Sequence, residues 1–232
     1  WMPGGRRFVV IDPGSAEPGE NARLLAVIAR RVALGDAVEA VVLSHHHRDH
    51  VSGAGAIASA LGVPVLAHPD TLARIPALPD GVVTRSLKDG DTLDLDGTTL
   101  RAVHTPGHAP GHLAFFDEAR RVLIAGDLVS GLSTILVGFA DGDMDVYLDA
   151  LRVAAALDPK VVLPSHGPPL PGKALAATIA HREKREAGIV AVLADGAPRD
   201  LATIAAAVYA DTRSAPGFLR EMQTRAHLTR LA

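Results

Sequence analysis

The chain has 232 residues, of which 48% are hydrophobic and 21% charged, and its formal net charge is -3. This length suits one large α/β domain, alone or with a small appendage, and the composition excludes a disordered or collagen-like chain. Cysteine is absent, which excludes disulfides, thiol nucleophiles and thiolate metal ligands. No run approaches the roughly 18 apolar residues of a membrane span. We therefore expect a soluble, cytoplasmic protein with no membrane partner.

Charge divides the chain into two unequal parts. Residues 1–170 carry 14 Lys and Arg against 20 Asp and Glu, whereas residues 171–232 carry 9 against 6. A mildly basic tail is usually a solvated helical surface and only weakly indicates nucleic acid. Arginine outnumbers lysine by 19 to 4 and alanine occurs 40 times. Such usage is typical of a GC-rich coding sequence, and it predicts a bacterial source.

The predicted elements alternate between strand and helix as far as residue 170. Apolar runs predict strands at 8–11, 40–43, 64–67 and 161–163, and alternation predicts strand pairs over 92–103 and 112–125, the first with an Asp-Gly turn at Asp96-Gly97. Helical spacing predicts helices at 20–34, 53–61 and 144–155. The segments 71–84 and 130–143 are predicted loops on which substrate choice depends. The pattern leaves open what precedes Trp1, a removed signal peptide included.

After Pro171 the pattern predicts helices only, at 173–193, 201–209 and 216–231. Short breaks at Gly196-Ala197-Pro198 and Ala215-Pro216-Gly217 separate them. We therefore predict a catalytic domain over 1–170 and a helical C-terminal extension over 171–232.

Four histidines lie within the six residues from His45 to His50, directly after a predicted buried strand. Alternate side chains of an extended segment share a face, so His45 and His47 are placed to hold one ion together. Asp49 and His50 follow where the chain enters a helix, and they point to a neighbouring site. His46 falls on the opposite face, and we interpret it as a supporting or packing residue.

Three further segments carry metal-binding residue types at strand ends. His104, His108 and His112 recur at four-residue spacing around a Pro-Gly turn and compete for one ligand role, while Asp127 and His166 each follow a predicted strand. A lone strand-end Asp is usually a turn cap, and a lone His is usually a surface residue. The order and number of these residues favour a metal centre over those separate explanations.

Together the motifs H-x-H-x-D-H, T-P-G-H, G-D and P-x-H-G resemble the metallo-β-lactamase-fold hydrolases over residues 8–170. The resemblance implies a four-layer αββα sandwich with the metals at one edge of the paired sheets. It implies a first metal on His45, His47 and His108, a second on Asp49, His50 and His166, and Asp127 as the bridge. Asp12 would support the ligands through hydrogen bonds.

Departures within that family narrow the expectation. The best-known zinc β-lactamases use a cysteine ligand, and the cysteine-free subclass lacks a bridging aspartate. A β-lactamase activity is therefore less favoured for this chain. Diiron relatives carry Glu at the position of His47, so two Zn²⁺ ions are expected in preference to Mn²⁺ or Fe²⁺. The tail from His181 and the stretch 126–147 resemble the β-lactamase-like protein 2 branch, whose C-terminal extension is a winged helix. The chain stops at Ala232, where the wing strands would begin, so only a partial winged helix is expected.

These residues predict a dinuclear zinc hydrolase, in which Asp49 and Asp127 are catalytic and a shared hydroxide attacks a small ester, thioester or lactone. The alternative is a single-strand-specific endoribonuclease with single-stranded RNA as partner, because the animal member of the similar branch acts on such RNA. Aromatic residues make up 3% of the chain, which offers few platforms for stacked bases. A non-catalytic binding protein is less favoured because all seven ligands are present. The oligomeric state is left open.

Overall fold

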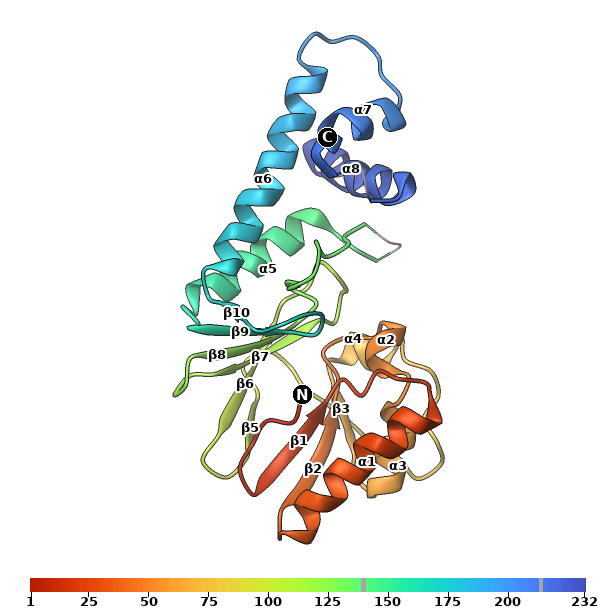
Figure 1. Cartoon of the computed structure of the whole chain (residues 1–232), viewed down its shortest axis with the longest axis vertical. Coiled ribbons are helices and arrows are strands. Elements are labelled where there is room, and N and C mark those ends of the chain that lie inside the picture. Colours follow the sequence, from red (N-terminus) through yellow and green to blue (C-terminus); the bar gives the residue numbers. More distant parts are fainter. Residues whose placement is uncertain (139–140, 213–214) are drawn as a thin grey trace.

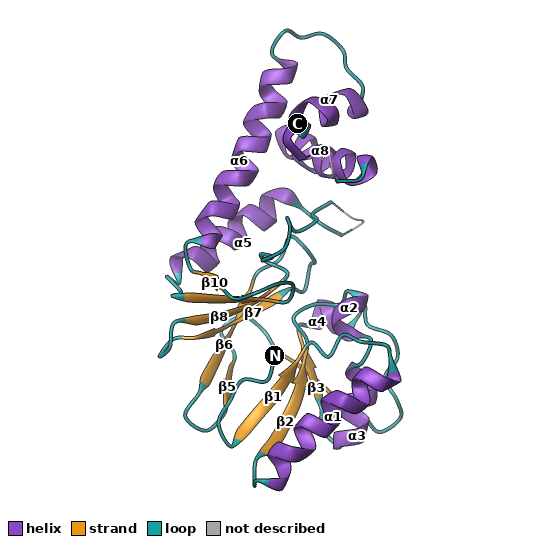
Figure 2. Cartoon of the chain, in the orientation of Figure 1, coloured by secondary structure: helices purple, strands orange, loops and turns teal. Residues whose placement is uncertain are grey.

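The computed structural model describes residues 1–138, 141–212 and 215–232. Two β-sheets face each other, with helices on both outer sides (Figures 1 and 2). The first sheet is parallel, in the order β1 (Arg7–Ile11), β2 (Ala37–Val42), β3 (Val65–Ala67) and β4 (Thr84–Ser86). The second has the order β10-β9-β8-β7-β6-β5. Its strands are β5 (Thr92–Asp94), β6 (Thr99–His104), β7 (Leu113–Asp117), β8 (Val122–Gly126), β9 (Val161–Pro164) and β10 (Leu170–Pro171).

Only the β8–β9 pair of the second sheet is parallel among the described residues. A parallel pair needs a crossover, and helix α5 (Met144–Ala156) supplies it. The other helices up to residue 170 are α1 (Pro18–Ala33), α2 (Arg48–Val51), α3 (Ala54–Leu61) and α4 (Pro69–Leu72). The C-terminal part forms α6 (Ala174–Leu193), α7 (Leu201–Val208), a 3₁₀ turn (Ala210–Thr212) and α8 (Gly217–Leu231).

Alternation along the strands explains the layers. Phe8 and Val10 pack with Ile28 of α1 and with α3, whereas Val9 and Ile11 lie in the cluster between the two sheets. The outer face of the second sheet packs on α5, with Tyr147 at 0% exposure. Each sheet therefore buries both faces, because successive side chains point in opposite directions. This arrangement confirms the predicted two-sheet α/β fold with helices outside.

Local predictions hold except where elements are short. Asp96 and Gly97 both have positive φ, 57° and 81°, as the predicted Asp-Gly hairpin turn requires. The segment 71–84 was expected to be a loop, but its ends belong to α4 and β4. Those elements have four and three residues, too few for periodicity to reveal, and β4 forms by pairing with β3. In the predicted loop 130–143, residues 139–140 lie outside the described residues.

The C-terminal helices pack on the second sheet's side of the molecule, and α6 runs beside α5 (Figure 1). Leu175 of α6 is fully buried in the same apolar cluster as α5, β7 and β8. Beyond Pro171 the described residues form helices, as predicted, and the winged-helix assignment stays a prediction. Among the described helices, none combines the length and apolar character needed to cross a bilayer.

Candidate metal centre

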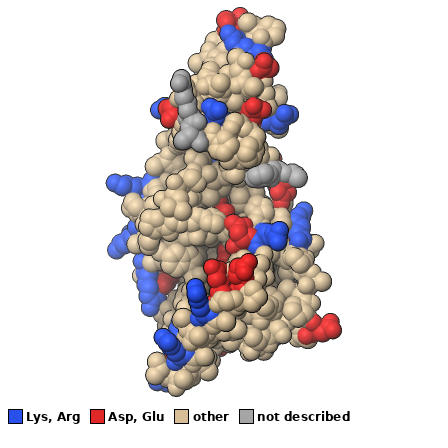
Figure 3. All heavy atoms as spheres, turned by 45° about the vertical axis from the view of Figure 1, so that its right-hand side comes forward, with Lys and Arg blue, Asp and Glu red and all other residues tan. Residues whose placement is uncertain are grey.

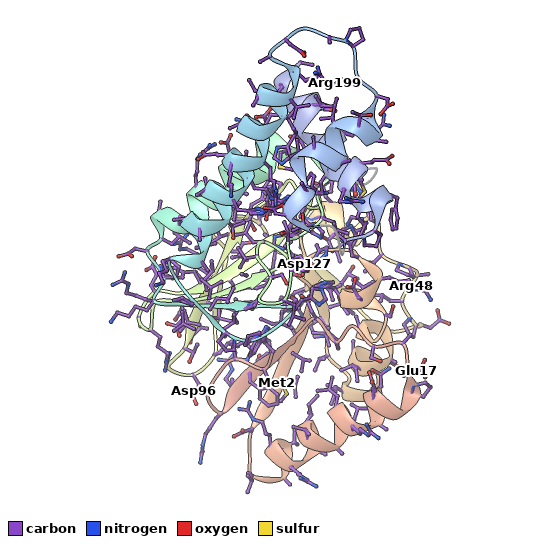
Figure 4. The ribbon with its side chains drawn as sticks, turned by 45° about the horizontal axis from the view of Figure 1, so that its top comes forward. Met2, Glu17, Arg48, Asp96, Asp127 and Arg199 are labelled. Atoms are coloured by element: carbon purple, nitrogen blue, oxygen red, sulfur yellow. The ribbon has the colours of Figure 1, made fainter. Side chains whose placement is uncertain are left out.

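The predicted ligands converge where strands of both sheets end. His45 follows β2, His47 immediately precedes α2, Asp127 follows β8 and His166 follows β9. Figure 4 places Asp127 near the middle of the molecule, where the two sheets and the C-terminal helices approach one another. Acidic side chains also gather in the middle of the face shown in Figure 3. Parallel neighbours β8 and β9 end at the same edge, which is why Asp127 and His166 meet.

The structure brings the first predicted ligand group together. The nitrogens of His45, His47 and His108 lie within 4.8 Å of one another, and His45 Nε2 is 3.0 Å from His47 Nδ1. Burial lowers the pKa of His108 to about 4 and that of His45 well below its ordinary value. Both rings are therefore neutral at pH 7, as metal ligation requires.

The second predicted group, Asp49, His50 and His166, also lies within 4.8 Å. His166 Nε2 is 3.4 Å from Asp49 Oδ2, and His50 Nε2 is 3.8 Å from the same oxygen. The Asp49 side chain is 63% exposed, so this group lies at the open side of the site.

Asp127 stands between the two groups, with one oxygen toward each. Its Oδ2 is 3.5 Å from His108 Nε2, whereas its Oδ1 is 3.5 Å from His50 Nε2 and 3.4 Å from His166 Nε2. Two ligands about 2.0 to 2.1 Å from one tetrahedral zinc lie about 3.3 to 3.4 Å apart. The observed separations therefore match ligands that share an ion on each side of the carboxylate.

Three buried polar atoms of this cluster have no hydrogen-bond partner among the described residues, namely His50 Nε2, His108 Nε2 and Asp127 Oδ1. Buried polar atoms in a folded protein are normally satisfied. A cation on these atoms would satisfy them, so the donor set fits a divalent metal.

Asp12, predicted as a supporting residue, organises the second group from behind. Its carboxylate accepts bonds from Ser44 N at 2.7 Å and Ser44 Oγ at 2.6 Å, and it lies 2.9 Å from His50 Nδ1. Although burial opposes the charged ring, Asp12 and Asp127 raise the pKa of His50 to about 10. Without metal His50 is protonated, so an ion that binds its Nε2 displaces a proton.

His112 supports the chain at Asp127, a position that its spacing in the sequence did not reveal. It is fully buried, and its Nε2 accepts a bond from the backbone N–H of Asp127 at 3.0 Å. Its Nδ1 must then carry the proton and donate to Thr105 Oγ1 at 2.8 Å. His112 thus holds the chain at Asp127. The four-residue spacing marked it as a candidate, but only the fold shows that it faces backbone instead of metal.

His104 and His46 lie outside both predicted groups. The His104 ring stacks on His68 with centroids 4.3 Å apart, and its Nε2 lies 2.9 Å from the carbonyl of Pro110. His46 Nε2 lies 2.9 Å from Asp141. His46, His47 and Asp141 also form a group whose ligand atoms lie within 4.8 Å of one another. The sequence did not indicate this group.

His108 is oriented by a segment that the C-terminal helices hold. His108 Nδ1 donates to the carbonyl of Leu136 at 2.8 Å, which leaves Nε2 free to face Asp127. Arg182 of α6 donates to the carbonyl of Ile135, and Gln223 of α8 donates to that of Val137 at 2.5 Å. The carbonyls of residues 135 and 137 therefore accept hydrogen bonds from the C-terminal helices, and the carbonyl between them accepts one from His108.

A cavity of 430 Å³ opens over the cluster. Its walls are formed by His47, Asp49, His108, Asp127, His166, Ser130 and residues 132–136. The cavity is large enough for a small substrate, and five of the seven predicted ligands line it, namely His47, Asp49, His108, Asp127 and His166.

A profile of the metallo-beta-lactamase superfamily matches residues 3–166. The chain belongs to this superfamily. The match covers most of the chain, and it confirms the resemblance drawn from the motifs. The assignment to the β-lactamase-like protein 2 branch stays a prediction.

Several similar curated proteins are fungal and longer than this chain. Lactamase-like protein aptB of Emericella nidulans is 30% identical over 199 residues, which are 82% of this chain and 57% of that protein. Atrochrysone carboxyl ACP thioesterase AgnL7 of Paecilomyces divaricatus is 33% identical over 156 residues, which are 63% of this chain and 44% of that protein. The chain thus spans about half the length of these relatives. Their fungal origin does not fit the expectation of a bacterial source.

Solved structures share the fold. A beta-lactamase domain protein from Burkholderia ambifaria has a TM-score of 0.81 at 24% identity, covering 97% of this chain and 76% of that one. A protein solved in a di-iron-bound form has a TM-score of 0.63 at 30% identity, covering 77% and 91%. The Burkholderia likeness extends over the C-terminal helices.

Proposed function

We propose that this protein is a dinuclear zinc hydrolase that cleaves small thioesters. The observation that carries the proposal is the position of Asp127, whose two carboxylate oxygens face two separate ligand groups at ligand-sharing distances. The names of two relatives support the thioester class, since AgnL7 and a protein of Aspergillus fumigatus are both called atrochrysone carboxyl ACP thioesterase.

In this proposal, His45, His47 and His108 would hold one ion, Asp49, His50 and His166 would hold the other, and Asp127 would contribute to both. Bound there, zinc lowers the pKa of water and polarises a carbonyl oxygen. Asp127 offsets the repulsion between two cations, and His112 and Asp12 keep Asp127 and His50 in place. The exposed Asp49 lies at the open side of the site, and its carboxylate would both contribute to the second group and accept a proton from the attacking water. Hydrolysis breaks the C–S bond and yields a carboxylic acid and a thiol.

The ribonuclease alternative draws less support from the C-terminal part. Arg185 pairs with Asp211, Arg199 with Asp195, and Arg230 with Glu186 and Asp145. Each of these three arginines is paired with an acid of the chain, so these three add little to a surface that would follow an RNA backbone. Lactones share the carbonyl chemistry of thioesters and are therefore assayed beside them.

The test begins with metal-free protein loaded separately with Zn²⁺ and Fe²⁺, because one relative was solved with two irons. Metal content is measured per chain, and each form is assayed on a thioester, a lactone and a fluorogenic single-stranded RNA. We expect two zinc ions per chain and thioester cleavage that Asp127→Ser slows at least about a hundredfold. One ion per chain, or RNA cleavage without thioester cleavage, would contradict the proposal.

A further inference from the structure

A second cavity of 470 Å³ adjoins the metal centre. It lies between residues 132–136 and the helices α6 and α8, and Tyr209, Thr212 and Ala215 of the connection between α7 and α8 complete its lining. The two cavities share four lining residues, Leu132, Ser133, Thr134 and Leu136. A single segment therefore separates the metal site from a space that the proposed reaction does not use.

The wall of this second cavity is basic and apolar. Among the described residues no acidic side chain lines it, whereas His181, Arg182, Arg185 and Arg220 do. The remaining lining residues are Tyr209, Thr212, Ala215, Leu219 and Gln223. Of these basic residues, Arg185 is paired with an acid outside the lining, Asp211, at 2.7 Å.

Two of the guanidinium groups have no counter-charge within the described part of the chain. Arg182 is 1% exposed, and it donates only to neutral oxygens, those of Gln223 and Ile135. Arg220 is half-buried and forms no ion pair with a described residue, although its Nε is buried without a partner. A buried charge is costly unless it is paired, so Arg182, with Arg220 beside it in the same lining, favours an anion in the cavity.

The buried polar atoms of the wall that lack a hydrogen-bond partner also favour an anionic ligand. They are Tyr209 Oη and the Nε atoms of Arg182, Arg185 and Arg220. Each carries a hydrogen to donate, and the three Nε atoms have no acceptor capacity. The missing partner is therefore an acceptor, and carboxylate or phosphate oxygens are the acceptors that guanidinium groups bind best.

We propose that this cavity binds an anionic group of the substrate, a carboxylate or a phosphate carried on an apolar body, while the scissile carbonyl lies over the metal centre. Leu132, Leu136 and Leu219 provide the contact for the apolar body. The inference rests on the proposed function, because it assigns the two ends of one thioester to neighbouring cavities. It narrows the substrate class from thioesters in general to acidic thioesters.

Matched thioesters test the inference by kinetics. One pair differs in the acyl part, which ends in a methyl or a carboxylate group, and another differs in the thiol part, which carries a hydroxyl or a phosphate. In one of the two pairs, we expect the anionic member to have a kcat/KM at least about tenfold higher than the neutral member, because its KM is lower. Which pair shows the difference tells whether the bound anionic group belongs to the acyl part or to the thiol part. Arg220→Gln should bring that ratio close to one. Tyr209→Phe provides a second variant should Arg220→Gln fold poorly.

Arg225→Gln is the matched control, because Arg225 lies on the same helix, is exposed and does not line the cavity. It should leave the ratio at the wild-type value. Equal kcat/KM for neutral and anionic members of both pairs, or equal loss in Arg220→Gln and Arg225→Gln, would overturn the inference.

A binding measurement separates this inference from the proposed function. Phenyl phosphate and benzoate are titrated by calorimetry into the zinc-loaded wild type and Arg220→Gln. We expect at least about tenfold weaker binding of one probe by the variant, since any contact with the metals is common to both proteins. If this difference appears but no thioester is cleaved, the reaction is wrong and the anion site stands. If thioesters are cleaved and neither probe distinguishes the proteins, the anion site is wrong and the reaction stands.

Discussion

Asp127 lies where both ligand groups meet, and its substitution tests the bridge. Asp127→Ser removes the oxygens that face His108, His50 and His166, so the second ion should be held less tightly. We expect zinc content to fall toward one ion per chain and turnover to fall at least about a hundredfold, the scale of other losses of electrostatic stabilisation. Metal analysis and steady-state kinetics measure both.

Asp94→Ser is the control for that substitution, because Asp94 is an exposed carboxylate at the end of β5. It should keep both ions and full turnover. Two retained ions and near wild-type turnover in Asp127→Ser would reduce Asp127 to a turn residue.

His108 and His104 differ by four positions and are expected to differ completely in role. His108→Ala removes a nitrogen from the first group, so zinc bound there and activity should be lost. His104→Ala removes only a stacking partner of His68 and a contact to Pro110, so zinc content should stay unchanged. Metal analysis of the two purified variants checks this, and equal zinc loss from both would show that the ligand is misassigned.

Segment 135–137 links the C-terminal helices to the metal centre. Gln223→Leu leaves the Val137 carbonyl and one Arg182 nitrogen without partners. A buried polar group left unsatisfied costs about 1 to 3 kcal/mol, and we expect that loss in the free energy of unfolding. Because Leu136 in this segment orients His108, zinc affinity of the first group should also weaken, which competition with a chelator measures.

Thr224→Val is the matched control on α8. Thr224 is equally buried, but its hydroxyl bonds only to the carbonyl of Arg220 in its own helix. It should change zinc affinity little. If Gln223→Leu lowers stability and leaves zinc affinity as in Thr224→Val, the helices support the fold without positioning His108.

Stability of the whole molecule should depend on pH through His227, which is fully buried on α8. Burial, and secondly the charge of Arg182, lower the pKa of His227 to about 4, against the partial compensation of Glu186. Arg230, also on α8, lowers the pKa further. In the unfolded chain its pKa is about 6.5, so the unfolded state binds the proton more readily between these values. This contribution is complete above pH 6.5 and is lost as the pH falls toward 4, by up to about 3 kcal/mol.

Chemical unfolding of the metal-free protein at pH 7.5 and 4.5 measures this dependence. The variant His227→Leu has no proton to gain, so its free energy of unfolding should fall less between the two pH values than that of the wild type. Equal losses in the two proteins would show that other groups govern the acid response. Metal is removed from both so that loss of zinc does not enter the comparison.

Periodicity predicted the alternating strands and helices and the all-helical C-terminal part, whereas the two-sheet fold and the membership of the superfamily were predicted from the resemblance of the motifs to a known family. Apolar alternation reports which faces of a strand are buried, and strands such as β1 and β7 bury both faces. The short elements α4, β4 and β10 were not predicted, because two to four residues carry no readable period and pairing with a neighbour stabilises them.

The sequence by itself determined which residue types are available for metal binding: histidines and aspartates at strand ends, and no cysteine. Only the tertiary structure decided which of the clustered histidines face one another. His104, His108 and His112 have the same spacing, yet one stacks on His68, one faces Asp127 and one holds the Asp127 backbone. The cationic cavity likewise joins residues 132–136 to helices some 50 to 90 residues later in the chain, and no local pattern encodes contacts between side chains that only folding brings together.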